Sequence, residues 1–145
     1  MIHVIAVRTG SWMLHRSIDN GASLTGIAKI SRRDDGRFDY RERGRLCLAD
    51  GKLIDAARRY IFAEEPDGFE VLFAEIPLRR FHPIPMREDG PNLVGSAEHF
   101  CAPDQYDSRY EFHADGKFVI RHVVRGPRKH YTMLTHYDGE PLIRR

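Results

Sequence analysis

The chain has 145 residues, and its 23 lysines and arginines nearly balance its 21 aspartates and glutamates, for a formal charge of +2. A chain of this length fits one domain that needs no disulfide or metal to be stable, so we expect a single domain over residues 1–145. The composition excludes collagen, a disulfide scaffold and a disordered acidic tail. The balanced charge argues against a dedicated nucleic-acid-binding protein, which usually has a clearly basic domain.

The two cysteines, Cys47 and Cys101, are too few for a secreted disulfide framework. The apolar stretch from Val4 to Val7 is too short for a signal sequence, and no apolar run approaches the ~18 residues of a membrane-spanning helix. We therefore expect a cytoplasmic protein without a membrane partner. Edge pairing or rim contacts could make a homodimer, although no heptad pattern or large apolar patch argues for one.

Turn signals recur at short intervals along the whole chain. Asp-Gly and Asn-Gly supply the positive-φ positions of tight hairpins. Their regular spacing between segments rich in aromatic and β-branched residues predicts an all-β meander of short antiparallel strands. These signals are Asp19-Asn20-Gly21, Asp34-Asp35-Gly36, Asp50-Gly51, Pro66-Asp67-Gly68, Asp89-Gly90-Pro91, Asp115-Gly116, Gly126-Pro127 and Asp138-Gly139.

Several segments between these turns alternate apolar and polar side chains, as half-buried strands do. The first begins at Trp12, and the second, residues 37–48, places arginines on one parity and apolar residues on the other. We expect the arginine face to contact water. Such a face could bind nucleic acid or a phosphorylated partner, but more often it is simply solvated or prevents an edge strand from pairing with another chain. The remaining alternating segments are residues 69–73, 118–124 and 129–137.

Two segments are harder to interpret. Residues 53–64 fit both a helical and a strand periodicity, and only the neighbouring strands favour a strand. Residues 81–97 contain three prolines and two glycines, so we expect a long irregular loop that covers a rim or mouth of the barrel.

Three charged residues, Arg16, Glu42 and Lys129, share parity with apolar neighbours. A buried charge is costly unless it is paired or hydrated, so these residues predict a polar network around an interior cavity. A structural ion pair beneath a packed core is an equal alternative. Lys129 could instead lie at a rim with its ammonium group in solvent, because it closely follows Gly126-Pro127.

The segment Gly10-Ser11-Trp12 resembles the Gly-x-Trp motif of lipocalins and related calycin barrels. In those proteins the tryptophan closes the base of an up-and-down barrel, and an arginine from a late strand stacks on it. The resemblance therefore implies a lipocalin-like barrel in which Gly10, Trp12 and Arg128 form the structural motif.

A wider pattern resembles an uncharacterised bacterial and fungal family, a domain of unknown function with a lipocalin-like barrel. The family implies a fold but no activity, and His130 stands where it usually has an acidic residue. The matching motifs are Gly10-x-Trp12-x-Leu14-x-Arg16-x-Ile18, Gly26-x-Ala28, Tyr40-x-Glu42-x-Gly44, Arg59-Tyr60, Phe81-His82, His99-x-Cys101-x-x-Asp104-x-Tyr106, Gly126-Pro127-Arg128-Lys129-x-Tyr131 and Thr135-x-Tyr137.

A small barrel can enclose one ligand, and aromatic side chains with a few convergent polar groups are typical of such a site. The leading hypothesis is a binding site for a small, partly polar or anionic molecule. The expected ligand-binding residues are Arg16, Tyr40, Glu42, Tyr110, Lys129, Tyr131, Thr135 and Tyr137.

Two alternatives stay open. Burial could shift the pKa values of the same cluster enough for acid–base catalysis of an isomerase or cyclase type. A histidine could bind haem or a metal, with His82, His99, Cys101 and Asp104 as a further candidate site, although no metal motif is present. The sequence identifies no cofactor and no catalytic residue.

Overall fold

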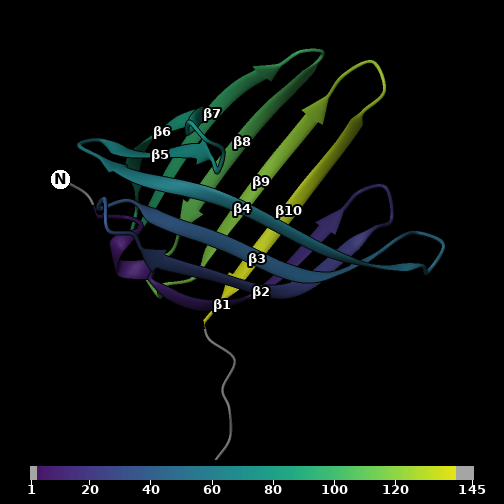
Figure 1. Ribbon diagram of the computed structural model, residues 1–145, viewed down its shortest axis with the longest axis horizontal. Coiled ribbons are helices and arrows are strands. Elements are labelled where there is room, and N and C mark those ends of the chain that lie inside the picture. Colours follow the sequence, from purple (N-terminus) through teal and green to yellow (C-terminus); the bar gives the residue numbers. More distant parts are fainter. Residues whose placement is uncertain (1–2, 140–145) are drawn as a thin grey trace, which may run out of the picture.

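The structure is a computed structural model that describes residues 3–139. Ten antiparallel strands form a closed barrel in which each strand pairs with its neighbours in the chain and β1 closes on β10 (Figure 1). A short 3-10 helix, η1 (Ala6–Arg8), precedes the barrel. The strands are β1 (Gly10–Ile18), β2 (Ser23–Arg32), β3 (Phe38–Cys47), β4 (Leu53–Glu65), β5 (Gly68–Phe73), β6 (Arg79–Asp89), β7 (Asn92–Cys101), β8 (Asp104–Phe112), β9 (Phe118–Arg125) and β10 (His130–Asp138).

The predicted all-β, up-and-down barrel is confirmed. Turn glycines adopt the positive φ that the hairpins require, at Gly21, Gly36, Gly51, Gly90 and Gly116. The ambiguous segment 53–64 is part of strand β4, whose second half pairs with β3 along one edge and with β5 along the other. Within residues 3–139 no helix is long and apolar enough to span a membrane.

The long irregular loop expected at 81–97 is wrong, since this segment forms most of β6 and β7. Pro83 and Pro85 sit at alternate, exposed positions of β6. β6 bonds to β7 only from Met86 onwards, so the prolines lie where β6 has a partner on one side alone. Proline is tolerated at such edge positions because its missing N–H breaks no ladder.

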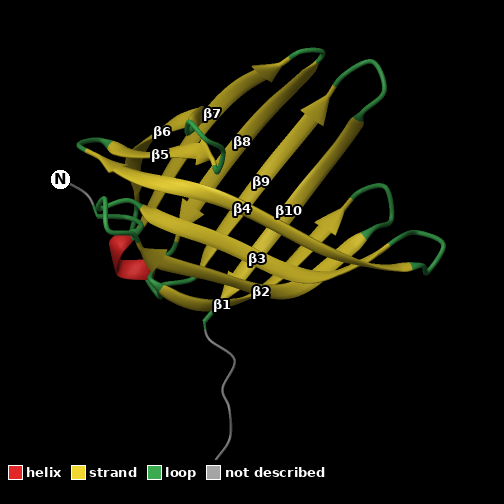
Figure 2. Ribbon diagram, viewed as in Figure 1, coloured by secondary structure: helices red, strands yellow, loops and turns green. Residues whose placement is uncertain are grey.

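The two ends of the barrel differ (Figure 2). Helix η1 lies at one end, the base, on the left of the view, and the β1–β2, β3–β4, β7–β8 and β9–β10 turns lie at the opposite, open end. At the base the guanidinium of Arg8 lies 4.7 Å from the ring centroid of Phe112 and donates hydrogen bonds to the carbonyls of Val4 and His113. The indole N–H of Trp12 donates to the carbonyl of Arg8 at 2.9 Å.

Trp12 therefore lies at the base, as the lipocalin resemblance implied, but its arginine partner is different. Arg128 lies in the β9–β10 turn at the open end and is exposed. Arg8, which precedes the first strand, closes the base in its place. The helical turn η1 can deliver this arginine because its chain folds back under β1, with Val4 and Ile5 buried in the core.

The wall of the barrel is incomplete on one side of the open end. β4 pairs with β5 only from Tyr60 onwards, so its half at Leu53–Arg59 bonds to β3 alone. Across the gap, the second half of β7, residues 96–101, bonds to β8 alone. The short β5–β6 hairpin covers only the part of this side nearer the base, toward the left of the view (Figure 1). No ladder pairs among the described residues join these two segments of β4 and β7.

Candidate functional site

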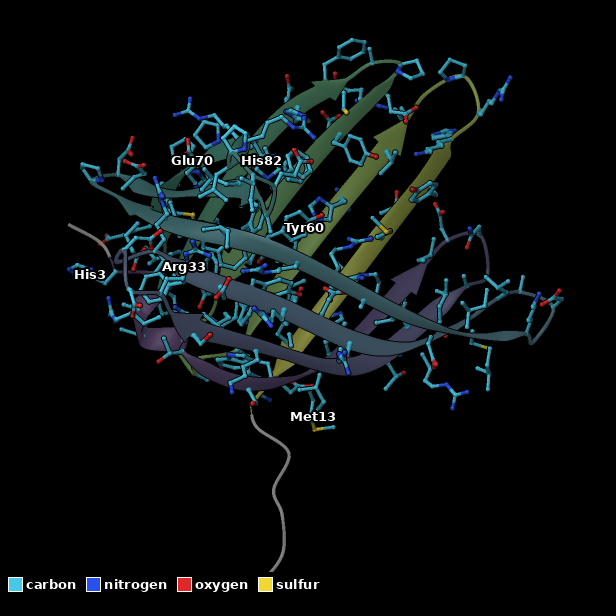
Figure 3. The ribbon with its side chains drawn as sticks, viewed as in Figure 1. His3, Met13, Arg33, Tyr60, Glu70 and His82 are labelled. Carbon is cyan, nitrogen blue, oxygen red and sulfur yellow. The ribbon has the colours of Figure 1, made fainter. Side chains whose placement is uncertain are left out.

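Strand alternation places Arg16 and Glu42 inside the barrel. Arg16 on β1 and Glu42 on β3 are 5% and 4% exposed, whereas Met13, on the other parity of β1, points away from the barrel (Figure 3). The outer face of β3 carries Arg41, Arg43 and Arg45, all exposed as expected. On these two strands, the alternation of the sequence therefore correctly distinguished the charged residues that face inward from those on the surface.

The interior charges form one connected network. Two guanidinium nitrogens of Arg16 donate to the two carboxylate oxygens of Glu42, at 2.8 and 2.9 Å. Nε of Arg16 donates to the Thr135 hydroxyl at 2.8 Å, and the Tyr40 hydroxyl donates to Glu42 at 2.5 Å. Tyr137 extends the chain with a hydroxyl 2.6 Å from that of Tyr40. Such a satisfied network offsets much of the cost of burying its charges.

The network fixes the protonation of its members. Burial acts to raise the pKa of Glu42, but the hydrogen bonds and charge of Arg16 outweigh it, so the pKa lies below its usual value. Burial also acts to lower the pKa of Arg16, and Glu42 reverses that effect and raises it. The pKa of Tyr137 is raised to about 12 by burial and by the nearby carboxylate of Glu42. At neutral pH the network is an ion pair with neutral tyrosines.

Three hollows surround this network. The deepest encloses about 20 Å³, which is room for about one water molecule, and is lined by Arg16, Glu42 and aromatic side chains. A hollow of about 310 Å³ opens at the β1–β2 and β3–β4 turns, lined in part by Leu24, Leu46 and Met133. A third, of about 150 Å³, is lined by side chains of β4, β6, β8, β9 and β10, and Tyr60, labelled in Figure 3, is one of them.

Arg58 on β4 lines all three hollows. Its Cα pairs with that of Glu42, so both side chains lie on the inner face of the sheet. Arg58 is exposed at the open end, and no carboxylate among residues 3–139 lies within ion-pair distance of its guanidinium. Its charge nevertheless reaches inward, where it contributes to lowering the pKa values of Glu42 and His122.

The structure brings most of the predicted ligand-binding residues together, with one exception. Tyr110 is buried beside the deep hollow, and Tyr131 lines the two outer ones. Lys129, in contrast, does not join Arg16 and Glu42. Its exposed ammonium group lies 3.2 Å from the carboxylate of Asp104 at the rim. Lys129 lies in the β9–β10 turn at the open end, just before β10 begins.

The further candidate group of His82, His99, Cys101 and Asp104 is not brought together. His82 is buried, with Nε2 at 2.9 Å from the Tyr110 hydroxyl, while His99 packs its edge against Phe81. Cys101 is exposed, and Asp104 is paired with the rim lysine. No group of three or more potential metal ligands occurs in the part of the chain that the structure describes.

Sequence reasoning missed Arg58 and His122 as interior polar groups. Arg58 shares the parity of Tyr60 and Phe62. Because segment 53–64 fitted both a helix and a strand, its sequence did not show that these residues share one inward face. His122 shares the parity of the buried residues Phe118 and Ile120, but parity alone does not show that it lines a hollow. In the structure it lines the hollows beside Arg58, and burial together with the charges of Arg58 and Arg16 lowers its pKa to about 4.

Comparison with curated proteins finds none that matches this chain. Comparison with protein families gives a match that runs from just before β1 to the turn after β10 and so spans the whole barrel. It includes every residue of the interior network and every residue named above in the linings of the three hollows. On this match over residues 9–139, the chain belongs to DUF6314, a family of unknown function.

Proposed function

We propose that the barrel binds a small amphiphilic anion at its open end. The observation that carries this proposal is Arg58, an inward-facing cation that lines all three hollows and has no acidic partner in the described chain. A ligand held in the mouth of an up-and-down barrel is also the arrangement of the lipocalins, which the Gly10-Ser11-Trp12 segment resembles.

The charge count inside the barrel favours an anion. Arg16 and Glu42 neutralise each other, and His122 is neutral at physiological pH because its pKa is lowered to about 4. Arg58 therefore leaves one positive charge facing the interior. A guanidinium at the mouth of a cleft binds carboxylate, phosphate or sulfonate groups through charge-assisted hydrogen bonds.

The lining favours an apolar or aromatic body attached to that anion. The larger outer hollow, at about 310 Å³, is at the lower end of the size of small-molecule sites and carries Leu24, Leu46 and Met133. The hollow of about 150 Å³ adds the rings of Tyr60, Phe81 and Tyr106. An apolar body could displace water from these surfaces, at about 25 cal/mol for each Å² buried.

The acid–base alternative has weaker support. Both oxygens of Glu42 already accept hydrogen bonds from Arg16, and its pKa is lowered, so it is a poor proton carrier near neutral pH. Lys129 is held by Asp104 at the rim.

We also place the function in the cytoplasm, which the free thiols of Cys47 and Cys101 support.

The test uses two fluorescent probes of similar shape, the anion anilinonaphthalenesulfonate (ANS) and the uncharged phenylnaphthylamine. Arg58→Met should weaken ANS binding by about tenfold or more, as expected for one charge-assisted hydrogen bond, and leave phenylnaphthylamine binding nearly unchanged. Arg43→Met is the matched control, since it removes the same charge from the outer face of the neighbouring strand. Equal losses for Arg58→Met and Arg43→Met, or for both probes, would contradict the proposal.

Native mass spectrometry of freshly purified protein gives a second, independent test. A small molecule retained by the wild-type protein and lost from Arg58→Met would identify the natural ligand class. A retained molecule without an acidic group would contradict the anionic part of the proposal.

A further inference from the structure

His122 is a second polar group that faces the interior beside Arg58, and its ring is hydrogen-bonded to Ser108. The two residues are directly paired on β8 and β9, and the hydroxyl oxygen of Ser108 lies 2.6 Å from Nδ1 of His122. Ser108 is only 4% exposed. The orientation of the imidazole is therefore set by a short hydrogen bond inside the wall of the barrel.

This hydrogen bond selects one tautomer of the ring. If Nδ1 carried the proton, the buried hydroxyl hydrogen of Ser108 would have no acceptor among the described residues. An unsatisfied buried donor costs about 1–3 kcal/mol. If Ser108 donates to Nδ1 instead, both groups are satisfied and the proton of the neutral ring resides on Nε2.

The protonated Nε2 is free to bind a ligand. The only hydrogen bond of the His122 ring within residues 3–139 is the one at Nδ1. The ring lines the deep hollow and the hollow of about 150 Å³, and Arg58 lines both of them as well. The neighbouring cations, Arg58 and Arg16, also keep the ring neutral, because with burial they lower its pKa. The site thus combines a charged donor with a neutral, directional one.

We propose that the oxyanion of the ligand is held between the guanidinium of Arg58 and the Nε2–H of His122, with Ser108 as the positioning residue. This inference rests on the proposed function and deepens it, since it names the recognised group as a carboxylate, phosphate or sulfonate. The other tautomer would present a lone pair to the anion and repel it. Ser108 therefore affects affinity without touching the ligand.

The direct test is heteronuclear NMR of the histidine ring nitrogens, with the signals of His122 assigned by their loss in His122→Gln. Wild-type protein at neutral pH should show His122 protonated on Nε2, and addition of ANS should shift Nε2 more than Nδ1. Ser108→Ala should populate the other tautomer, whereas Ser96→Ala, an exposed serine on the adjacent strand β7, should not. A wild-type ring protonated on Nδ1 would overturn the inference.

Binding measurements provide the second readout. Ser108→Ala and His122→Leu should each weaken ANS binding about threefold to tenfold, as for one neutral hydrogen bond, without changing phenylnaphthylamine binding. His122→Gln should rescue most of the affinity, because its amide nitrogen replaces the donor near the position of Nε2. If ANS binding depends on Arg58 but not on His122 or Ser108, this inference is wrong and the proposed function stands. If the wild-type protein binds no anion, both fall.

Discussion

Arg16 and Glu42 meet across an intervening strand. Arg16 is on β1, Glu42 is on β3, and β2 between them presents Gly26 and Ala28 on the same inner face. These two small residues leave room for the guanidinium of Arg16 and the carboxylate of Glu42 to meet in a two-point contact. The ion pair therefore depends on β2 having no large inward side chain at its centre, as well as on its own two members.

Breaking the pair on one side should be strongly destabilising. Glu42→Gln keeps the shape of the side chain but leaves the buried charge of Arg16 without a counter-ion, at a cost of about 3–5 kcal/mol. Urea unfolding followed by circular dichroism measures the free energy of unfolding. The double variant Arg16→Met/Glu42→Leu should lose less than Glu42→Gln. A loss under about 1 kcal/mol for Glu42→Gln would show that the pair is hydrated rather than buried.

Stability should fall on mild acidification because of His82. Burial, with smaller effects from the charges of His122 and His99, lowers the pKa of His82 to about 3, against an ordinary value of 6.5. Between these pH values the unfolded state binds a proton that the folded state does not, so the free energy of unfolding decreases as pH falls below 6.5, by up to about 1.4 kcal/mol per pH unit. It is constant above that range.

The measurement is a series of urea unfolding curves between pH 7 and pH 5, which is above the ordinary pKa of Glu42 at 4.5. His82→Gln should have a shallower pH dependence than the wild-type protein, even though the substitution itself lowers stability. His122, with a pKa lowered to about 4, contributes in the same direction and accounts for a residual slope in the variant. A wild-type stability that is flat across this range would contradict the buried, neutral state of His82.

Local sequence signals predicted the strands well, and they failed where a feature depends on the whole barrel. Apolar and polar side chains alternate because one face of each strand contacts solvent and the other contacts the interior. The residues two positions away therefore indicated that Arg16 and Glu42 face inward. The prolines of β6 misled because their tolerance depends on which stretch of β7 pairs with β6, a long-range property.

The site was only partly predictable for the same reason. Which residues share an interior follows from parity, but which of them meet depends on how far each lies along the barrel axis. Lys129 has the inward parity of β10, yet it lies beyond the open end and pairs with Asp104. Arg8 comes from outside every predicted strand, and only the folded chain shows that it reaches the base.

Arg8 should be needed to shield the only tryptophan of the protein. Arg8→Ala removes the guanidinium above Phe112 and two hydrogen bonds to carbonyls, at an expected cost of about 1–3 kcal/mol. Because the indole of Trp12 donates to the Arg8 carbonyl, loosening of this segment should admit water and shift the tryptophan emission to longer wavelength. Fluorescence spectra and urea unfolding measure both effects.

Arg128→Ala is the matched control for the base, since Arg128 is exposed at the opposite end of the barrel. It should change neither the emission of Trp12 nor the free energy of unfolding by more than about 0.5 kcal/mol. A red shift caused by Arg128→Ala and not by Arg8→Ala would reverse the assignment of the base arginine.

Gly26 should tolerate no side chain, because the backbones of β2 and β3 approach closely at this point. A Cβ at residue 26 would overlap the carbonyl oxygen of Arg43 and the Cα of Gly44, and backbone atoms in a paired strand cannot move aside without opening the ladder. Gly26→Ala should therefore cost at least the ~1–3 kcal/mol of an overpacked core. It should also disturb Glu42, which lies two residues before Gly44 on β3. Thr25→Ala, an exposed change on the same strand, is the control in urea unfolding, and equal stabilities for the two variants would contradict the close approach.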